Sequence, residues 1–122
     1  MQHKIFVYGT LMRNRANHAR YLKGQQYLGE AVLCDYALYD LGSFPGIVPE
    51  PGEKVKGEVY CVDSFTLERI DILEVNGRLY TRTPVRILLN DEWAEAEAYV
   101  YNGMVSPEDK VAFESQPWKG RY

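Results

Sequence analysis

Short apolar runs separated by turn-forming residues dominate the pattern along this chain. The apolar run at residues 5–8 is unbroken, which predicts a strand over residues 4–8 that is buried on both faces. Apolar and polar side chains alternate instead at residues 85–89, where Val85 and Ile87 are apolar and Arg86 between them is charged. This alternation is typical of a strand with one face on the core and the other exposed to solvent. Six strands are predicted, at residues 4–8, 28–33, 36–41, 56–62, 80–89 and 94–101. Turn markers separate them at Cys34-Asp35, Gly42-Ser43, residues 49–52 and Asn90-Asp91.

Helical signals are fewer and concentrate in one segment, residues 64–74. Asp63 or Ser64 can cap its start, and Asn76-Gly77 can supply a left-handed stop beyond its end. Shorter helices are expected at residues 17–23 and within 106–115. The pattern predicts an α+β fold, a single domain over residues 1–122, with one main helix and one or two short helices. Its evenly spaced strands, about six to seven in number, favour a curled sheet or a small mixed β-barrel.

One acidic residue of the main helix interrupts its apolar face. At 100° per residue, Leu67, Ile70 and Leu73 form a stripe, and Glu74 falls inside it. An inward carboxyl has a raised pKa, which suits acid-base chemistry near neutral pH. The alternative is structural: at the last turn the side chain can bend back to water or pair with Arg78 or Arg82.

The first strand ends abruptly at Gly9, and Thr10, Leu11 and two arginines, Arg13 and Arg15, follow it. A glycine here can simply serve the turn. It can also let a ligand approach the chain, with backbone N–H groups and Arg13 binding a carboxylate. No base stands beside Thr10 in the sequence, which argues against a nucleophilic hydroxyl. The 10 tyrosines can either line a pocket or cover the ends of a barrel.

Composition excludes several classes of protein. The net charge of −3 argues against nucleic acid as the main partner. No segment approaches the roughly 20 apolar residues of a membrane helix, and the start leads directly into a strand, leaving no room for a signal peptide. A cytoplasmic protein is therefore expected. Cys34 and Cys61 are expected to be reduced core thiols, and the two histidines have no metal-ligand spacing.

Four motifs, in order along residues 4–101, resemble the gamma-glutamylcyclotransferase-like family, and within it the gamma-glutamylamine cyclotransferase branch. They are Tyr8-Gly9-Thr10-Leu11, Pro45-Gly46-Ile47-Val48-Pro49, Gly57-Glu58-Val59-Tyr60, and Ile70-Asp71-Ile72-Leu73-Glu74 followed by Gly77, Tyr80 and Arg82. The chain departs from many relatives near Asn14, where they have glycine, and in a longer turn after Glu74. Its last twenty residues are the least comparable.

The resemblance implies a small mixed β-barrel and a cyclising cleavage. The α-amino group of a γ-glutamyl amine or amino acid attacks its own γ-carbonyl and releases 5-oxoproline and a free amine. Glu74 would be the general base and acid, and Tyr8, Gly9, Thr10, Leu11 and Tyr80 would bind substrate. The resemblance implies no metal and no cofactor, and its partner is a small γ-glutamyl compound. A non-catalytic binding module on the same fold is the alternative. Oligomeric state stays open, as does whether Trp118 in the tail closes a pocket or simply docks.

Overall fold

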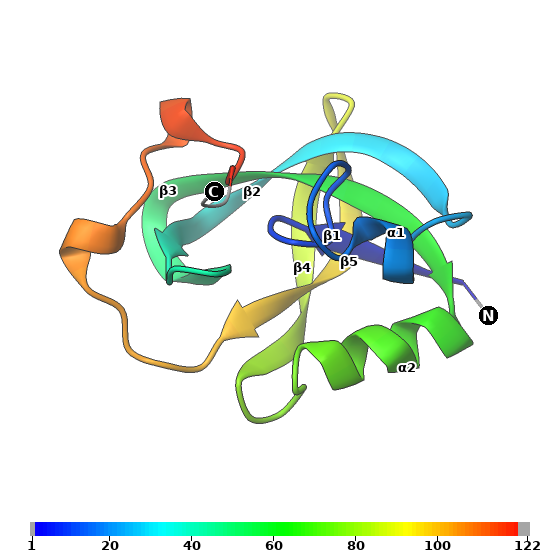
Figure 1. The fold of residues 1–122 in the computed structure, drawn as a ribbon. Helices are drawn as coiled ribbons and strands as arrows, with labels where there is room; N and C mark the ends of the chain where they lie inside the picture. The colour runs from blue at the N-terminus through cyan, green and yellow to red at the C-terminus, as the bar shows by residue number, and fades with distance from the viewer. Residues whose placement is uncertain (1, 120–122) are drawn as a thin grey trace.

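A computed structural model describes residues 2–119 of the chain (Figure 1). Its strands are β1 (Gln2–Val7), β2 (Gln26–Asp40), β3 (Pro45–Asp63), β4 (Tyr80–Leu89) and β5 (Glu92–Tyr101). The helices are α1 (His18–Tyr21) and α2 (Ser64–Leu73), and two 3-10 turns, Pro107–Asp109 and Phe113–Ser115, follow the last strand. Since α2 is the longest described helix, at 10 residues, none within residues 2–119 has the length to cross a bilayer.

The five strands form one sheet in the order β1-β3-β2-β4-β5, and the sheet closes on itself where β5 meets β1. All neighbours are antiparallel except β1 and β5, which share one parallel pair, Ile5 opposite Glu97. The mixed fold with few helices is confirmed. The expected number of six to seven strands is wrong.

A bulge explains the difference in strand number. The predicted strands at residues 28–33 and 36–41 are one continuous strand, β2, because Asp35 bends the chain without ending it. Asp35 has φ 67°, and its side chain accepts a hydrogen bond from the N–H of Gly52 on β3 (3.0 Å). The register with β3 shifts at this point, so the marker at Cys34-Asp35 produces a bulge instead of a turn. The marker at Asn90-Asp91 does form a hairpin, with both residues at positive φ.

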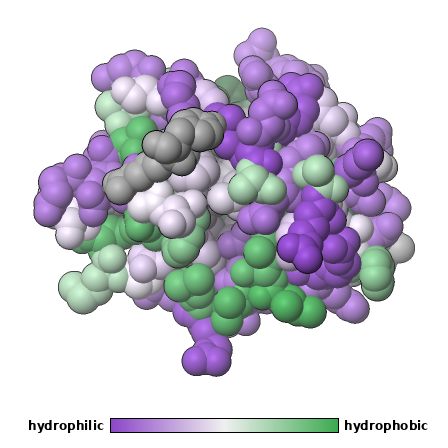
Figure 2. Space-filling view, in the orientation of Figure 1, coloured by the Kyte–Doolittle hydropathy of each residue, from purple (hydrophilic) through white to green (hydrophobic). Residues whose placement is uncertain are grey.

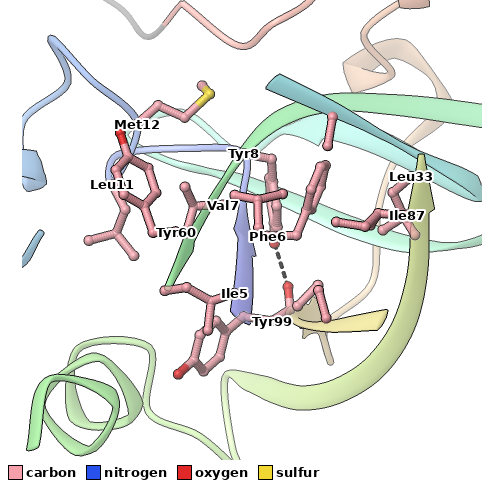
Figure 3. Close-up of a cluster of buried hydrophobic side chains, with 14 of the residues drawn as sticks. Ile5, Phe6, Val7, Tyr8, Leu11, Met12, Leu33, Tyr60, Ile87 and Tyr99 are labelled. Atoms are coloured by element: carbon pink, nitrogen blue, oxygen red, sulfur yellow. Dashed lines mark hydrogen bonds between the residues drawn. The ribbon is translucent and has the colours of Figure 1, made fainter. Parts of the chain in front are cut away.

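The core lies inside the closed sheet and between the sheet and α2. Ile5 and Phe6 are adjacent in β1, yet both are fully buried (Figure 3). Consecutive burial requires protein on both faces of a strand, and α2 contacts the outside of β1 and β3. The prediction of a strand buried on both faces is confirmed. The buried stretch continues one residue beyond β1, to Tyr8, and so fixes the position of the loop that follows.

Helix α2 begins as predicted and ends differently. The Asp63 side chain accepts a hydrogen bond from the Thr66 N–H (2.7 Å), which caps the first turn. At the other end the left-handed residue is Val75, with φ 50°, and the N–H of Asn76 bonds to the carbonyl of Asp71. The left-handed residue that ends the helix is therefore one position earlier than the expected Asn76-Gly77. A β-branched residue in this conformation is strained, and it directly follows Glu74.

The tail after β5 docks on the sheet without forming the helix expected within residues 106–115, which is replaced by the two short 3-10 turns. The buried Gln116 side chain accepts from Lys56 N (2.8 Å) and donates to the carbonyls of Lys54 and Val111. Arg15 donates two hydrogen bonds, of 3.0 and 2.8 Å, to the carbonyl of the buried Trp118. These contacts hold the tail against β3 and the loop after β1.

Both cysteines are free, as expected, but neither is a core residue. Cys34 and Cys61 are each partly exposed, and the thiol of Cys61 donates to the side-chain oxygen of Gln2 (3.3 Å). The alternation of the strands places them on the outer side of the sheet, where partial exposure follows.

Candidate active site

A small hollow of about 40 Å³ opens where β1 ends. We call it the inner hollow. All six residues singled out in the sequence line it: Tyr8, Gly9, Thr10, Leu11, Glu74 and Tyr80. They come from the end of β1, the end of α2 and the start of β4, three segments that the closed sheet and its packed helix bring together. The remaining lining residues are Phe6, Val7, Phe44, Pro45 and Tyr99.

A second and larger hollow, of about 250 Å³, adjoins the first. We call it the outer hollow. The two share Thr10, Phe44, Glu74 and Tyr80, so these residues mark the junction. Five residues line the outer hollow alone: Ala16, Asn17, Ser43, Leu73 and Leu79. A bound molecule can therefore extend from the inner to the outer hollow past the Glu74 carboxyl.

Glu74 closes the last turn of α2 and stands at this junction. Within residues 2–119, no hydrogen bond or ion pair reaches its carboxyl. The expected pairing with Arg78 or Arg82 is wrong: among the described residues neither forms an ion pair with Glu74, and Arg82 binds two other carboxylates. The surrounding protein removes water from the carboxyl, and this desolvation raises the pKa of Glu74 to about 7. The group is thus ready both to take and to give a proton near neutral pH.

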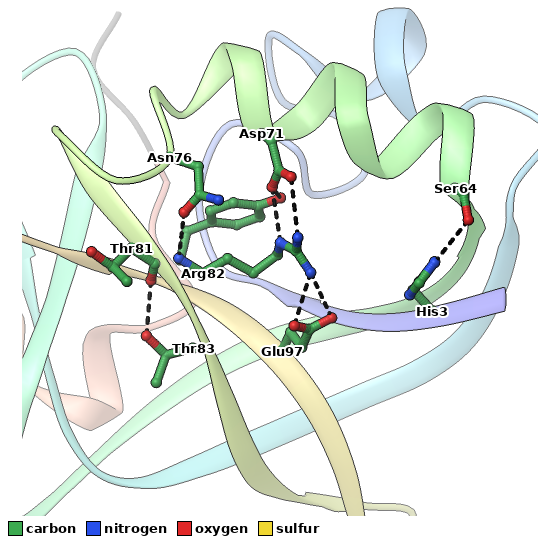
Figure 4. A network of polar contacts seen from close by, with 9 residues as sticks. His3, Ser64, Asp71, Asn76, Thr81, Arg82, Thr83 and Glu97 are labelled. Atoms are coloured by element: carbon green, nitrogen blue, oxygen red, sulfur yellow. Dashed lines mark hydrogen bonds and ion pairs between the residues drawn. The ribbon is translucent and has the colours of Figure 1, made fainter. Parts of the chain in front are cut away.

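An ionic network anchors the turn that carries Glu74 (Figure 4). Arg82 on β4 donates to both oxygens of Asp71 on α2, at 2.9 and 3.2 Å. The same guanidinium donates to both oxygens of Glu97 on β5, at 3.0 and 2.9 Å. The Arg82 N–H also bonds to the side chain of Asn76 (2.8 Å), just beyond the helix. Bidentate geometry of this kind fixes orientation as well as distance, so the end of α2 is held against β4 and β5.

Three tyrosines surround the inner hollow, and each donates its hydroxyl proton to a fixed acceptor. Tyr8 donates to the carbonyl of Tyr99 (2.6 Å, Figure 3), and Tyr80 donates to the carbonyl of Pro45 (2.7 Å). Tyr99 donates to Asp71 (2.6 Å). Desolvation is the main cause that raises the pKa of all three well above the ordinary value. For Tyr99 the hydrogen bond to Asp71 and the charge of that carboxylate come next, and the nearby Glu74 charge adds a smaller effect on each tyrosine. These hydroxyls stay protonated. Because each already donates its proton, each can only accept a hydrogen bond from a ligand, through its oxygen lone pairs.

The loop after β1 supplies hydrogen-bond donors, in the form of backbone N–H groups without a partner among the described residues. The carbonyls of Gly9 and Thr10 accept from Met12 and Asn17, which folds the loop back on itself. Within the described part of the chain, no acceptor takes the N–H of Thr10 or Leu11. The ring of Pro45 packs against Gly9, and a Cβ there would lie 2.8 Å from two ring carbons. Gly9 therefore permits the close approach of the loop to the Pro45 segment, and both segments line the inner hollow.

The two arginines after β1 point away from both hollows. Arg13 lies over the Tyr27 ring, 4.2 Å from its centroid, and its guanidinium is 3.7 Å from Glu58. Arg15 holds the tail through Trp118. Neither lines the site, so the expected role of Arg13 in binding a substrate carboxylate is wrong. The free N–H groups of Thr10 and Leu11 are donors that do line the site. Trp118 lines neither hollow, so it docks the tail and does not close the pocket.

Comparison with known proteins identifies the family of this chain. The family model described as "Gamma-glutamyl cyclotransferase, AIG2-like" matches residues 5–120. The chain belongs to the gamma-glutamylcyclotransferase family. The Escherichia coli (strain K12) gamma-glutamylcyclotransferase family protein YtfP is 36% identical over 118 residues, 97% of each chain. Gamma-glutamylaminecyclotransferase B of Danio rerio is 33% identical over 109 residues, covering 80% of this chain and 57% of its own.

The fold agrees with solved members as well. The crystal structure of an AIG2-like protein from Mus musculus superposes with a TM-score of 0.76 and 25% identity, covering 99% of this chain and 88% of that one. The family resemblance drawn from four short motifs is thus confirmed over nearly the whole chain.

The sequence predicted none of the other lining residues, five in the inner hollow and five more in the outer one, and Phe44, Pro45 and Tyr99 show why. Phe44 directly precedes β3 and Pro45 is the first residue of that strand, and the motif beginning at Pro45 is the signal that could have found them. Tyr99 breaks the simple alternation of β5, since it is buried next to the buried Ala98. Its burial comes from the position of α2, because its hydroxyl bonds to Asp71 of that helix. Strand periodicity contains no information about such a contact.

A pH-dependent difference in stability is expected between the wild type and Glu74→Gln. The folded state holds the Glu74 proton up to about pH 7, whereas the unfolded chain releases it near pH 4.3. The stabilisation from this proton is complete below about pH 4 and is lost as the pH rises through 7. Above that pH the variant, which has no charge to bury, should be more stable by about 3–4 kcal/mol.

Urea unfolding at several pH values from about 4.5 to 8.5 measures this difference. The two proteins should be about equally stable at the acid end, and the variant should gain progressively toward the alkaline end. A difference that does not change with pH would show that Glu74 titrates as an ordinary exposed carboxyl.

Proposed function

We propose that this protein cleaves γ-glutamyl amines by intramolecular cyclisation, releasing 5-oxoproline and a free amine. The observation that carries the proposal is an unpaired Glu74 carboxyl, with a pKa of about 7, at the junction of two hollows. The name of the Danio rerio relative, a gamma-glutamylaminecyclotransferase, supports the choice of an amine leaving group. A pure binding module has no need of an unpaired carboxyl at this point.

The inner hollow suits the γ-glutamyl end of the substrate, which carries one ammonium and one carboxylate. The lone pairs of the Tyr8, Tyr80 and Tyr99 hydroxyls, together with Glu74, accept from the ammonium. The free N–H groups of Thr10 and Leu11 donate to an anionic oxygen, either the α-carboxylate or the γ-carbonyl as it gains charge. The two sets of groups face one narrow space, so the substrate is folded toward ring closure before reaction.

Glu74 then moves one proton in two steps. As a carboxylate it takes a proton from the α-ammonium, and the freed amine attacks the γ-carbonyl carbon to form the five-membered ring. The tetrahedral intermediate carries its negative charge on the former carbonyl oxygen. Glu74, now protonated, gives its proton to the leaving nitrogen, the C–N bond breaks, and the carbonyl re-forms. The ring nitrogen, which enters the intermediate with two hydrogens and a positive charge, loses the second proton, and this proton ends on the released amine. The products are 5-oxoproline and the amine in its ammonium form. Proton transfer of this kind typically contributes about 10²–10⁴-fold to rate. The carboxyl returns to its starting state, and the scheme requires neither metal nor cofactor.

The test is an assay of 5-oxoproline release. Purified protein is incubated with γ-glutamyl-ε-lysine, γ-glutamyl-alanine and simple γ-glutamyl alkylamides, and the product is quantified against a no-protein control. Release from an alkylamide or from the ε-lysine compound supports the proposal. Binding of these compounds without any release would instead favour a binding module on the same fold.

A further inference from the structure

The motif Gly57-Glu58-Val59-Tyr60 lines neither the inner nor the outer hollow. It lies on β3 beside the end of β1, where Glu58 is paired with Val7, the last residue of that strand. Position 57 needs glycine, since a Cβ there would overlap the carbonyl oxygen of Val7. The motif therefore brings β3 directly against the point at which the loop after β1 begins.

The first residues of that loop form a tight turn. The N–H of Met12 donates to the carbonyl of Gly9 (3.1 Å), so Thr10 and Leu11 are the two central residues of the turn. The bond that closes such a turn leaves out the N–H groups of its central residues, and these are the two free donors of the inner hollow. The direction of both donors depends on how the turn is held at each end.

One end of the turn continues from β1, and Glu58 holds the other. Its Oε1 accepts from the backbone N–H of Arg13 (3.0 Å), the residue that directly follows the turn. The same oxygen accepts from the hydroxyl of Tyr60 (3.0 Å), which fixes the carboxylate in place. Only 13% of the Glu58 side chain is exposed, so most of it is shielded from water.

We infer that Glu58 is a positioning residue: it holds the turn so that the N–H groups of Thr10 and Leu11 point at the anionic oxygen of the substrate. The inference rests on the cyclisation proposed above and gives a role in it to a residue outside both hollows. Donors that are already in place need no reorganisation as charge develops, and a misplacement of about 1 Å can cost about 10²-fold in rate. Without Glu58, the Arg13 N–H has no acceptor among residues 2–119.

The negative charge of Glu58 is separate from this role. The Arg13 guanidinium approaches the other oxygen, Oε2, at 3.7 Å, and 51% of the Arg13 side chain is exposed. An exposed pair at this distance contributes little. Both hydrogen bonds go to Oε1, which an amide oxygen can replace. Position 58 therefore needs an acceptor of the right reach, and not a charge.

Three variants of Glu58 separate the acceptor from the charge. Glu58→Gln keeps the acceptor without the charge, and should retain kcat/KM for 5-oxoproline release within about threefold of the wild type. Glu58→Met fills similar space without an oxygen, and should lower kcat/KM by about tenfold or more. Glu58→Asp keeps the charge but is one methylene shorter, and should lower it by about fivefold or more, which covers the case in which Glu58→Met folds poorly.

The matched control is Glu30→Met. Glu30 lies opposite Glu58 on β2 and is exposed, and its side chain forms no hydrogen bond within residues 2–119. Its substitution removes the same charge and should leave kcat/KM within about twofold of the wild type. Amide exchange at Arg13, followed by NMR, reports the anchor itself. It should be slower by about tenfold or more in the wild type and Glu58→Gln than in Glu58→Met.

Full activity of both Glu58→Met and Glu58→Asp would overturn the positioning role and leave the cyclisation intact. A loss in Glu58→Gln as large as that in Glu58→Met would also overturn it, because the charge and not the acceptor would then be what matters. Absence of 5-oxoproline release by the wild type would overturn the cyclisation itself, and the role of Glu58 with it.

Discussion

Glu74→Gln is expected to lower kcat/KM for 5-oxoproline release by about 10³-fold. The amide has nearly the shape of the carboxyl but cannot accept the proton of the α-ammonium, nor return one to the leaving nitrogen. The hollow around it stays intact, so substrate binding should change much less than turnover. Steady-state assays of 5-oxoproline, with circular dichroism to compare the folds, measure the effect.

Glu68→Gln is the matched control, since Glu68 is on the same helix and is exposed to solvent. It should retain the wild-type rate. Equal turnover by Glu74→Gln and the wild type would leave the reaction in place and remove Glu74 from it.

Arg82→Met is expected to destabilise the fold by about 2–4 kcal/mol and to lower activity by about 10-fold or more. The substitution removes the one cation that pairs with both Asp71 and Glu97, and leaves two carboxylates facing each other in a half-buried site. The lower part of the usual range for broken buried pairs applies because the Arg82 side chain keeps 25% of its surface exposed. Activity falls because Asp71 no longer holds the turn that carries Glu74.

Arg86→Met on the same strand is the control for this change. Arg86 is exposed and stacks on Trp93, 5.2 Å from the ring centroid, with no carboxylate partner within residues 2–119. Urea unfolding should show a loss of less than about 1 kcal/mol for it. If both arginine variants lost the same stability, the network seen in Figure 4 would not be what anchors the end of α2.

Some features of this site follow from the sequence because they depend on local periodicity. The position of Glu74 inside the apolar stripe of α2 follows from a helical wheel, and the burial of Leu67 and Ile70 confirms the stripe. The Asp63 cap and the turn at Asn90-Asp91 are local in the same sense. Each is decided by residues within one or two turns of each other.

Other features depend on contacts between distant segments, which periodicity does not encode. The bulge at Asp35 exists because Gly52 of the next strand bonds to its side chain. The burial of Tyr99 depends on Asp71, 28 residues earlier. Arg13 resembles an anion ligand in the sequence, yet the acid that it approaches, Glu58, comes from β3. The tail has a helical start signal but is shaped by the hydrogen bonds of Gln116 to β3.

Exposed apolar side chains gather at the lower edge of the molecule in Figure 2, the region that α2 occupies in Figure 1. Phe65, Ile72, Val75 and Leu79 are the exposed large apolar residues of α2 and the turn after it. The turn that carries Glu74 therefore combines three unfavourable features: exposed apolar surface, a strained Val75 and a desolvated carboxyl. Such features are tolerated where the surrounding contacts, here those of Arg82, compensate for them.

The measurement that tests the central claim most directly is the pH dependence of kcat/KM for 5-oxoproline release. It is made from about pH 5 to 8.5 on the substrate that turns over fastest. The base must be ionised to act, so the wild-type rate should rise about tenfold per pH unit and level off near pH 7, the pKa of Glu74. The residual rate of Glu74→Gln should lack this inflection. A wild-type rate that is already level at pH 5, or an inflection near pH 7 that persists in Glu74→Gln, would contradict the assignment of Glu74 as the base.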